Sequence, residues 1–141
     1  MSTTAMFTAV TETRQRRRTV AEFLQGLIET HTTPDERRGD ERIEIALAVA
    51  VIPCVDGQPD LDRAFPTITR DVSRDGVSLI VNRRFDEDQV VVGFSGTSIT
   101  FVRAEVIYRE SQVMGCWRLG LRMTEVVEVE SHAGLERFFL S

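Results

Sequence analysis

The chain has 141 residues, 42% hydrophobic and 28% charged, which suits one folded domain and excludes a disordered chain. No apolar run reaches the roughly 18 residues of a membrane span. The net charge of −5 argues against nonspecific binding of nucleic acid by the whole surface. The first ten residues lack the basic start and long apolar stretch of a signal peptide, so we expect a cytoplasmic protein.

The first 34 residues combine a basic arm with one amphipathic helix. Residues 1–18 are polar and end in the arginine-rich run Arg14–Arg18, so we expect a flexible arm. From Thr19 onward the spacing is helical, and one apolar stripe is formed by Val20, Phe23, Leu24, Leu27 and Ile28. Pro34 disfavours a helical conformation in the residue before it, so the helix should end there.

Residues 35–127 have the two-residue period of β-strands. The first strand alternates from Ile43 to Val51 and should end at Pro53, and Asp56–Pro66 has the composition of a loop. Further strands are expected at residues 67–72, 77–82, 89–95, 98–110 and 117–123.

Several short strands at regular spacing predict a mainly β fold, either an antiparallel sandwich or a small barrel, with a helix before it. The tail, residues 128–141, is a separate segment. A short C-terminal helix ending near Phe138 and Phe139 is one interpretation of it.

Two short motifs stand out within this region. The first is Arg37-Arg38-Gly39-Asp40-Glu41-Arg42, of the form RRxxxR, on the approach to the first long strand. About thirty residues later comes the second, Asp71-Val72-Ser73-Arg74-Asp75-Gly76, of the form DxSxxG, between two strands. Each motif alone is common, but both in this order and with β pattern between them are fairly specific.

This pair of motifs resembles the signature of PilZ domains, the bacterial receptors for the second messenger cyclic di-GMP. The resemblance covers roughly residues 36–124, including the late Leu119-Gly120-Leu121 stretch. It implies a six-stranded antiparallel barrel of the PilZ split type. It also implies a receptor that passes its signal to a downstream effector protein.

The chemistry of the ligand suits these residue types. Guanine offers O6 and N7 as paired acceptors, which arginine meets with two parallel hydrogen bonds, and arginine also pairs with phosphate. A carboxylate accepts hydrogen bonds from the guanine N1–H and N2–H₂ groups, which would be the role of Asp71. Ser73 would add a hydroxyl contact, and Gly76 would permit a positive φ or a close backbone approach to the ligand.

By resemblance, the ligand-binding residues are Arg37, Arg38, Arg42, Asp71, Ser73 and Gly76, with Gly120 as an additional candidate. Arg38 and Arg42 would be the essential pair of the first motif. In the family, an arginine at the position of Arg37 goes with binding of a stacked pair of cyclic di-GMP molecules. Arg37 therefore favours two ligands per chain.

Simpler interpretations of the same residues remain open. The arginines of the first motif could be a solvated run paired with neighbouring carboxylates, because exposed ion pairs contribute little. Asp71–Gly76 could be an ordinary β-turn. The Arg14–Arg18 run could be a solvated tail, an anion-binding arm that closes over the ligand, or a contact for an acidic partner or nucleic acid.

No enzymatic or metal site emerges from the sequence. It contains no GxSxG, P-loop or HExxH motif. Cys54 and Cys116 lack metal-ligand spacing, so we expect free thiols and no cofactor besides the nucleotide ligand.

Three functions remain to be compared. The first is a cyclic di-GMP receptor. The second is a PilZ-like interaction module that binds no nucleotide, against which the intact motifs speak. The third is an oligonucleotide-binding barrel, against which the acidic charge and the lack of exposed-looking aromatic residues on the strands speak.

Overall fold

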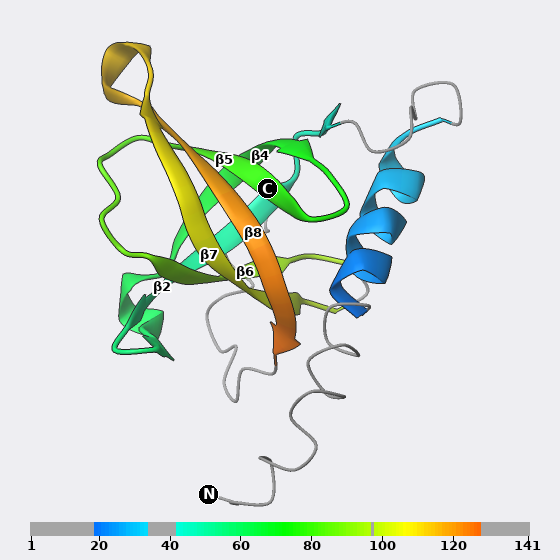
Figure 1. Cartoon of the computed structure of the whole chain (residues 1–141), viewed down its shortest axis with the longest axis horizontal. Helices are drawn as coiled ribbons and strands as arrows, with labels where there is room; N and C mark the ends of the chain where they lie inside the picture. Colours follow the sequence, from blue (N-terminus) through cyan, green and yellow to red (C-terminus); the bar gives the residue numbers. More distant parts are fainter. Residues whose placement is uncertain (1–18, 34–41, 97, 128–141) are drawn as a thin grey trace, which may run out of the picture.

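A computed structural model of the chain describes residues 19–33, 42–96 and 98–127, with one α-helix at residues 19–31 (Figure 1). The strands are β1 (Ile43–Glu44), β2 (Ala48–Val55), β3 (Gln58–Pro59), β4 (Phe65–Val72), β5 (Gly76–Val81), β6 (Gln89–Phe94), β7 (Thr100–Ser111) and β8 (Trp117–Val127). Two short 3-10 helices are η2 (Leu61–Arg63) and η3 (Val113–Gly115). Within the described residues, no helix is long and apolar enough to cross a membrane.

Six of the strands form a closed antiparallel barrel. Hydrogen-bonded neighbours follow the order β4-β5-β8-β7-β6-β2, and β2 closes the circuit by pairing with β4. To do so, β2 uses Ala48–Val51 toward β4 and Val49–Pro53 toward β6. The short strands β1 and β3 pair with β4 and β2 outside this circuit. The expected mainly β fold, a small six-stranded antiparallel barrel with an N-terminal helix, is therefore confirmed.

The apolar faces of the strands and of the helix share one core. The inward side chains of β5 and β8 are Val77, Leu79, Val81, Leu119, Leu121 and Met123, all buried. The helix adds Val20, Leu24 and Ile28 from its predicted stripe. Its Phe23 ring also meets Phe94 of β6 edge-on, with 5.2 Å between the ring centroids. The helix is thereby fixed against the barrel (Figure 1).

The first predicted strand differs from the structure. It is interrupted after Glu44, resumes at Ala48 and continues through Pro53 to Val55. Proline ends a strand only where its missing N–H is needed by a ladder. Pro53 still lies opposite Val90 of β6, but on the other side of β2 the ladder with β4 has already ended at Val51. The Pro53 carbonyl instead accepts a hydrogen bond from the Asp60 backbone N–H, so the prediction that Pro53 ends the strand is wrong.

The predicted loop Asp56–Pro66 also contains regular structure. Asp56 and Gly57 have φ values of 52° and 78°, and they turn the chain from β2 into β3. Such a turn needs positive φ at both central residues, which Asp and Gly tolerate best. β4 begins at Phe65, two residues before the predicted start.

A second, smaller apolar cluster lies on the other face of β2 and β6, formed by Ile52, Cys54, Val91 and Phe101. Burial raises the pKa of the Cys54 thiol, and the charge of Arg103 offsets part of that increase. The Arg103 Nη1 atom lies 3.8 Å from the sulfur.

Because a thiolate is the reactive form of cysteine, we expect the folded chain to protect Cys54 from thiol reagents. In a Cys116→Ser variant, alkylation between pH 7 and 9 should be much slower than in the same chain unfolded in urea. The pH at which the rate levels off should be higher in the folded chain than in the unfolded chain, because the pKa of Cys54 is raised only in the folded state. Equal rates in the folded and unfolded chains would contradict this expectation.

Candidate functional site

A buried carboxylate with two arginine partners lies on the outer wall of the barrel. Asp71 accepts from Arg42 Nη1 at 2.7 Å and from Arg118 Nη2 at 2.8 Å, one partner to each carboxylate oxygen. The Asp71 side chain is only 8% exposed, against 40% for Arg42 and 27% for Arg118. A carboxylate this deeply buried must be paired to remain charged at low cost. The two arginines supply that pairing.

Strand pairing explains why Arg42 and Asp71 meet. β1 pairs with β4 so that Glu44 lies opposite Asp71 and Ile43 lies opposite Val72. Continuing this register places Arg42 opposite Ser73, one step diagonally from Asp71. The last residue of the RRxxxR motif and the first residue of the DxSxxG motif are thus neighbours, although they lie 29 residues apart in sequence.

A β-bulge turns Asp71 toward the outside of the barrel. Thr69 pairs with Leu79, but the next pair is Asp71 with Ser78, so Arg70 is an extra residue on β4. A bulge shifts the alternation of side chains by one position. Without it, Asp71 would share the inward face of Thr69, which is 1% exposed.

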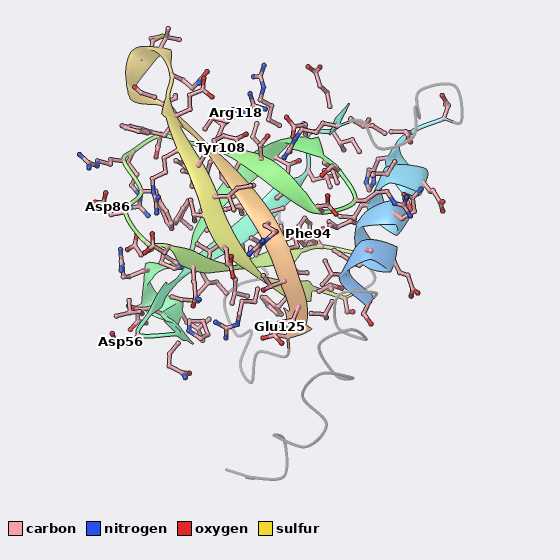
Figure 2. All side chains as sticks on the ribbon, in the orientation of Figure 1. Asp56, Asp86, Phe94, Tyr108, Arg118 and Glu125 are labelled. Atoms are coloured by element: carbon pink, nitrogen blue, oxygen red, sulfur yellow. The ribbon has the colours of Figure 1, made fainter. Side chains whose placement is uncertain are left out.

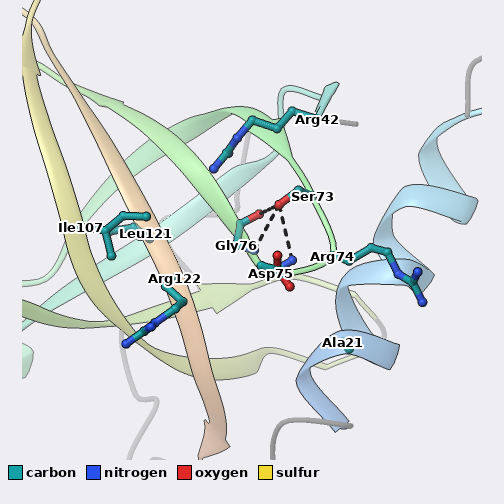
Figure 3. A pocket seen from close by; sticks show the side chains of 9 residues that line it. All are labelled: Ala21, Arg42, Ser73, Arg74, Asp75, Gly76, Ile107, Leu121 and Arg122. Atoms are coloured by element: carbon teal, nitrogen blue, oxygen red, sulfur yellow. Dashed lines mark hydrogen bonds between the residues drawn. The ribbon is translucent and has the colours of Figure 1, made fainter. Parts of the chain in front are cut away.

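The Ser73–Gly76 turn between β4 and β5 uses its own polar groups. The Ser73 N–H donates to the Gly76 carbonyl at 2.9 Å. The Ser73 hydroxyl oxygen accepts from the Gly76 N–H at 3.3 Å and from the Asp75 N–H at 3.4 Å (Figure 3). Ser73 therefore lies at the site with its hydroxyl engaged in the turn, as the ordinary β-turn interpretation expected.

Gly76 is required by close packing against β8. A Cβ atom on Gly76 would lie 1.9 Å from the Leu121 carbonyl oxygen. The glycines with positive φ in the described residues are Gly57 and Gly115, so Gly76 supplies no left-handed turn. The predicted positive φ is absent at Gly76, and the close contact that the structure shows is with the neighbouring strand, whereas the predicted one was with a ligand.

An open pocket of about 670 Å³ lies between this turn, the helix and the outer face of β8. This volume is in the range of small-molecule sites. Its lining residues, shown in Figure 3, are Ala21, Arg42, Ser73, Arg74, Asp75, Gly76, Ile107, Leu121 and Arg122. Three of the lining side chains are arginines, and they come from three different segments of the chain. Asp75 also lines the pocket, and Arg42 and Arg122 are paired with Asp71 and Glu105, so an anionic ligand would find arginines here by replacing these carboxylates as their partner.

Four of the six predicted site residues come together at this pocket. Arg42, Ser73 and Gly76 line it, and Asp71 is bound to Arg42 at its edge. The other two, Arg37 and Arg38, lie outside the described residues, as does the Arg14–Arg18 run.

Gly120, the additional candidate, does not line the pocket. The ring of Tyr108 lies over it, so that a Cβ on Gly120 would be 2.0 Å from Tyr108 Cε1.

Arg118 and Arg122 are not among the site residues predicted from the sequence. Both alternate on β8 with the inward residues Leu119 and Leu121, so their outward direction was predictable. The sequence does not indicate which wall of the barrel the two side chains would lie on. That depends on the pairing of β8 with β5, which places Arg122 opposite Gly76.

No family model matches this chain, and no curated protein matches it either. The resemblance to PilZ domains therefore stays a prediction carried by the two motifs.

The close contact at Gly76 predicts a clear effect of substitution. Gly76→Ala should lower the free energy of unfolding by about 1–3 kcal/mol, because the added methyl group would be forced against the β8 backbone. Gly26→Ala is a matched control, since Gly26 lies in the helix with nothing within 4 Å of its Cβ position. That change should raise the free energy of unfolding by about 0.5–1 kcal/mol. Denaturant unfolding measures both, and an unchanged Gly76→Ala midpoint would show that the contact relaxes freely.

Proposed function

We propose that the chain is a bacterial cyclic di-GMP receptor of the PilZ type that acts in the cytoplasm by binding and not by catalysis. The observation that carries the proposal is the convergence of the two motifs. Arg42 of the first motif and Asp71, Ser73 and Gly76 of the second surround one edge of a single pocket. Either motif could be incidental by itself, but residues of both at the edge of one pocket favour a shared role in binding.

The charges of the pocket suit a cyclic dinucleotide. Such a ligand carries two phosphates and two guanines, and arginine recognises both groups. Arg42 of the RRxxxR motif lines the pocket together with Arg74 and Arg122, which lie outside that motif. Arg122 is 59% exposed at its side chain and pairs with Glu105, so it has room to turn toward a ligand.

The ion pairs of Asp71 suggest how Arg42 would be released to the ligand. Breaking a buried ion pair is costly when it leaves a charge without a partner. Arg118 holds the second oxygen of Asp71 at 2.8 Å independently of Arg42. Arg42 can therefore exchange Asp71 for a phosphate or a guanine while the carboxylate stays paired.

The helix gives the proposed receptor a route for its signal. Ala21 lines the pocket, and the same helix is packed into the barrel core through Val20 and Leu24. A ligand in the pocket would touch the helix directly. If its affinity differs between two helix positions, binding shifts the population between them. A downstream effector protein would then recognise the changed surface.

A second candidate function is a PilZ-like interaction module that binds no nucleotide. It is favoured by the tip of the β7–β8 hairpin, where Val113 is 82% and Met114 is 96% exposed. Exposed apolar side chains at a projecting tip suit a contact with another protein. Titration with cyclic di-GMP separates this module from the receptor.

The receptor proposal predicts binding of cyclic di-GMP in a calorimetric titration, with much weaker binding of GMP. Arg42→Ala should weaken binding by about 10- to 100-fold, the effect of losing one charge-assisted contact. Arg63→Ala is a matched control. Arg63 is also a partly exposed arginine in an ion pair, with Glu87, but it belongs to η2 and does not line the pocket. No heat with micromolar cyclic di-GMP, or equal affinity of the Arg42→Ala and Arg63→Ala variants, would refute the proposal.

The stoichiometry provides a separate prediction. If Arg37 supports a stacked pair of ligands, the unmodified chain takes up two cyclic di-GMP molecules. Arg37→Leu should reduce this number toward one and keep the first binding event. The same calorimetric titration reports both numbers. A wild-type stoichiometry of one, or two ligands on the Arg37→Leu variant, would show that Arg37 does not set the number.

A further inference from the structure

Four residues form one row across the outer wall of the barrel, each on a different strand. Asp71 on β4 pairs with Ser78 on β5, Ser78 pairs with Gly120 on β8, and Gly120 pairs with Tyr108 on β7. Three inter-strand steps span about 14 Å. The proposed guanine-binding carboxylate stands at one end of this row. An aromatic ring stands at the other.

A bulge next to each end of the row turns its end residue outward. Arg70 is the extra residue beside Asp71, and Ile107 is the extra residue between Val106 and Tyr108. Val106 packs against the core, so regular alternation would have directed Tyr108 inward as well. Bulges are frequent beside functional sites, where they redirect a side chain. The bulged Ile107 itself lines the pocket, and Tyr108 is the next residue of β7.

The middle of the row leaves space for the ring. Because Gly120 has no side chain, the Tyr108 ring occupies the space beside the β8 backbone, with Tyr108 Cε1 at 2.0 Å from the position of a Cβ. The residue as a whole remains only partly buried. The Arg118 guanidinium carbon lies over the ring, 6.0 Å from its centroid (both residues are labelled in Figure 2).

Polar atoms near the ring have unused hydrogen-bonding capacity. Ser78 is fully buried, and its hydroxyl has no hydrogen-bond partner among the described residues. The Nε atom of Arg118 is likewise buried and without such a partner there. Because β5 lies between β8 and β4, the Arg118 side chain crosses β5, the strand of Ser78, to reach Asp71. Arg118 thus links the carboxylate end of the row to the aromatic end.

We propose that Tyr108, packed against Gly120, is a base-stacking platform next to the pocket, with the Arg118 guanidinium near enough to bind the edge of the stacked base. This inference rests on the proposed function and adds a subsite to it. A cyclic dinucleotide has two bases. One base would be bound by Asp71 and Arg42. The other base would stack on Tyr108, which belongs to neither motif.

The first test replaces the ring. Tyr108→Leu should weaken cyclic di-GMP binding by about 5- to 100-fold, the range for loss of one base–aromatic stack. Tyr108→Phe keeps the ring and should stay within about two-fold of wild type. Calorimetric titration gives the affinities, and thermal unfolding shows whether each variant is folded.

The second test moves the ring without replacing it. Gly120→Ala should displace Tyr108 and weaken binding by a similar factor. Gly93→Ala is the matched control on β6, where a Cβ would lie 3.0 Å from the ring of Phe101. That variant should bind as wild type does.

The third test observes the Tyr108 ring itself by fluorine NMR, which is possible because Tyr108 is the single tyrosine of the chain. Protein labelled with 3-fluorotyrosine should give one fluorine resonance that shifts when cyclic di-GMP is added. The Gly120→Ala variant should shift less.

The outcomes separate the two proposals. Wild-type binding together with an unshifted resonance, or with Tyr108→Leu affinity equal to wild type, overturns the platform and leaves the receptor standing. Failure of the wild-type chain to bind cyclic di-GMP overturns both.

Discussion

The outer wall of this barrel is organised around one carboxylate that cannot be left unpaired. Asp71 is nearly buried, and each of its oxygens has its own arginine. One arginine comes from the segment before β1 and the other from β8, so the carboxylate ties together three parts of the chain. Any event at the pocket that draws one arginine away is tolerable because the other remains.

The two arginines that pair with Asp71 differ in exposure and in their other contacts. Arg118 is the less exposed of the pair and is confined between the carboxylate and the Tyr108 ring. Arg42 is more exposed and lines the pocket, directly after the segment that holds the rest of its motif. A structural anchor and an exchangeable contact can therefore share the same carboxylate. The glycine at position 76 then brings β5 and β8 close enough for the turn, the pocket and the anchor to lie on one continuous surface.

Much of the fold could be predicted from alternation, because the residues that β5 and β8 contribute to the core, such as Val77 and Leu79 or Leu119 and Leu121, recur at every second position. The motif residues could be predicted from residue type and order. Three features could not. Pro53 inside β2 depends on where the β2–β4 ladder ends. The directions of Asp71 and Tyr108 depend on single-residue bulges, which leave no trace in an alternating pattern. The partners of Arg118 and Arg122 depend on long-range strand pairing, which periodicity alone does not contain.

Strand β7 lays an aromatic ring over a glycine on each of its two neighbours, Phe101 over Gly93 of β6 and Tyr108 over Gly120 of β8. In each pair the aromatic ring fills the space that a side chain at the glycine position would occupy. A larger residue at either glycine would collide with the ring, and a smaller residue in place of the ring would uncover backbone. During divergence of this protein the two members of a pair are therefore constrained to change together. Joint variation at 93 with 101, and at 108 with 120, would be the evolutionary trace of this packing.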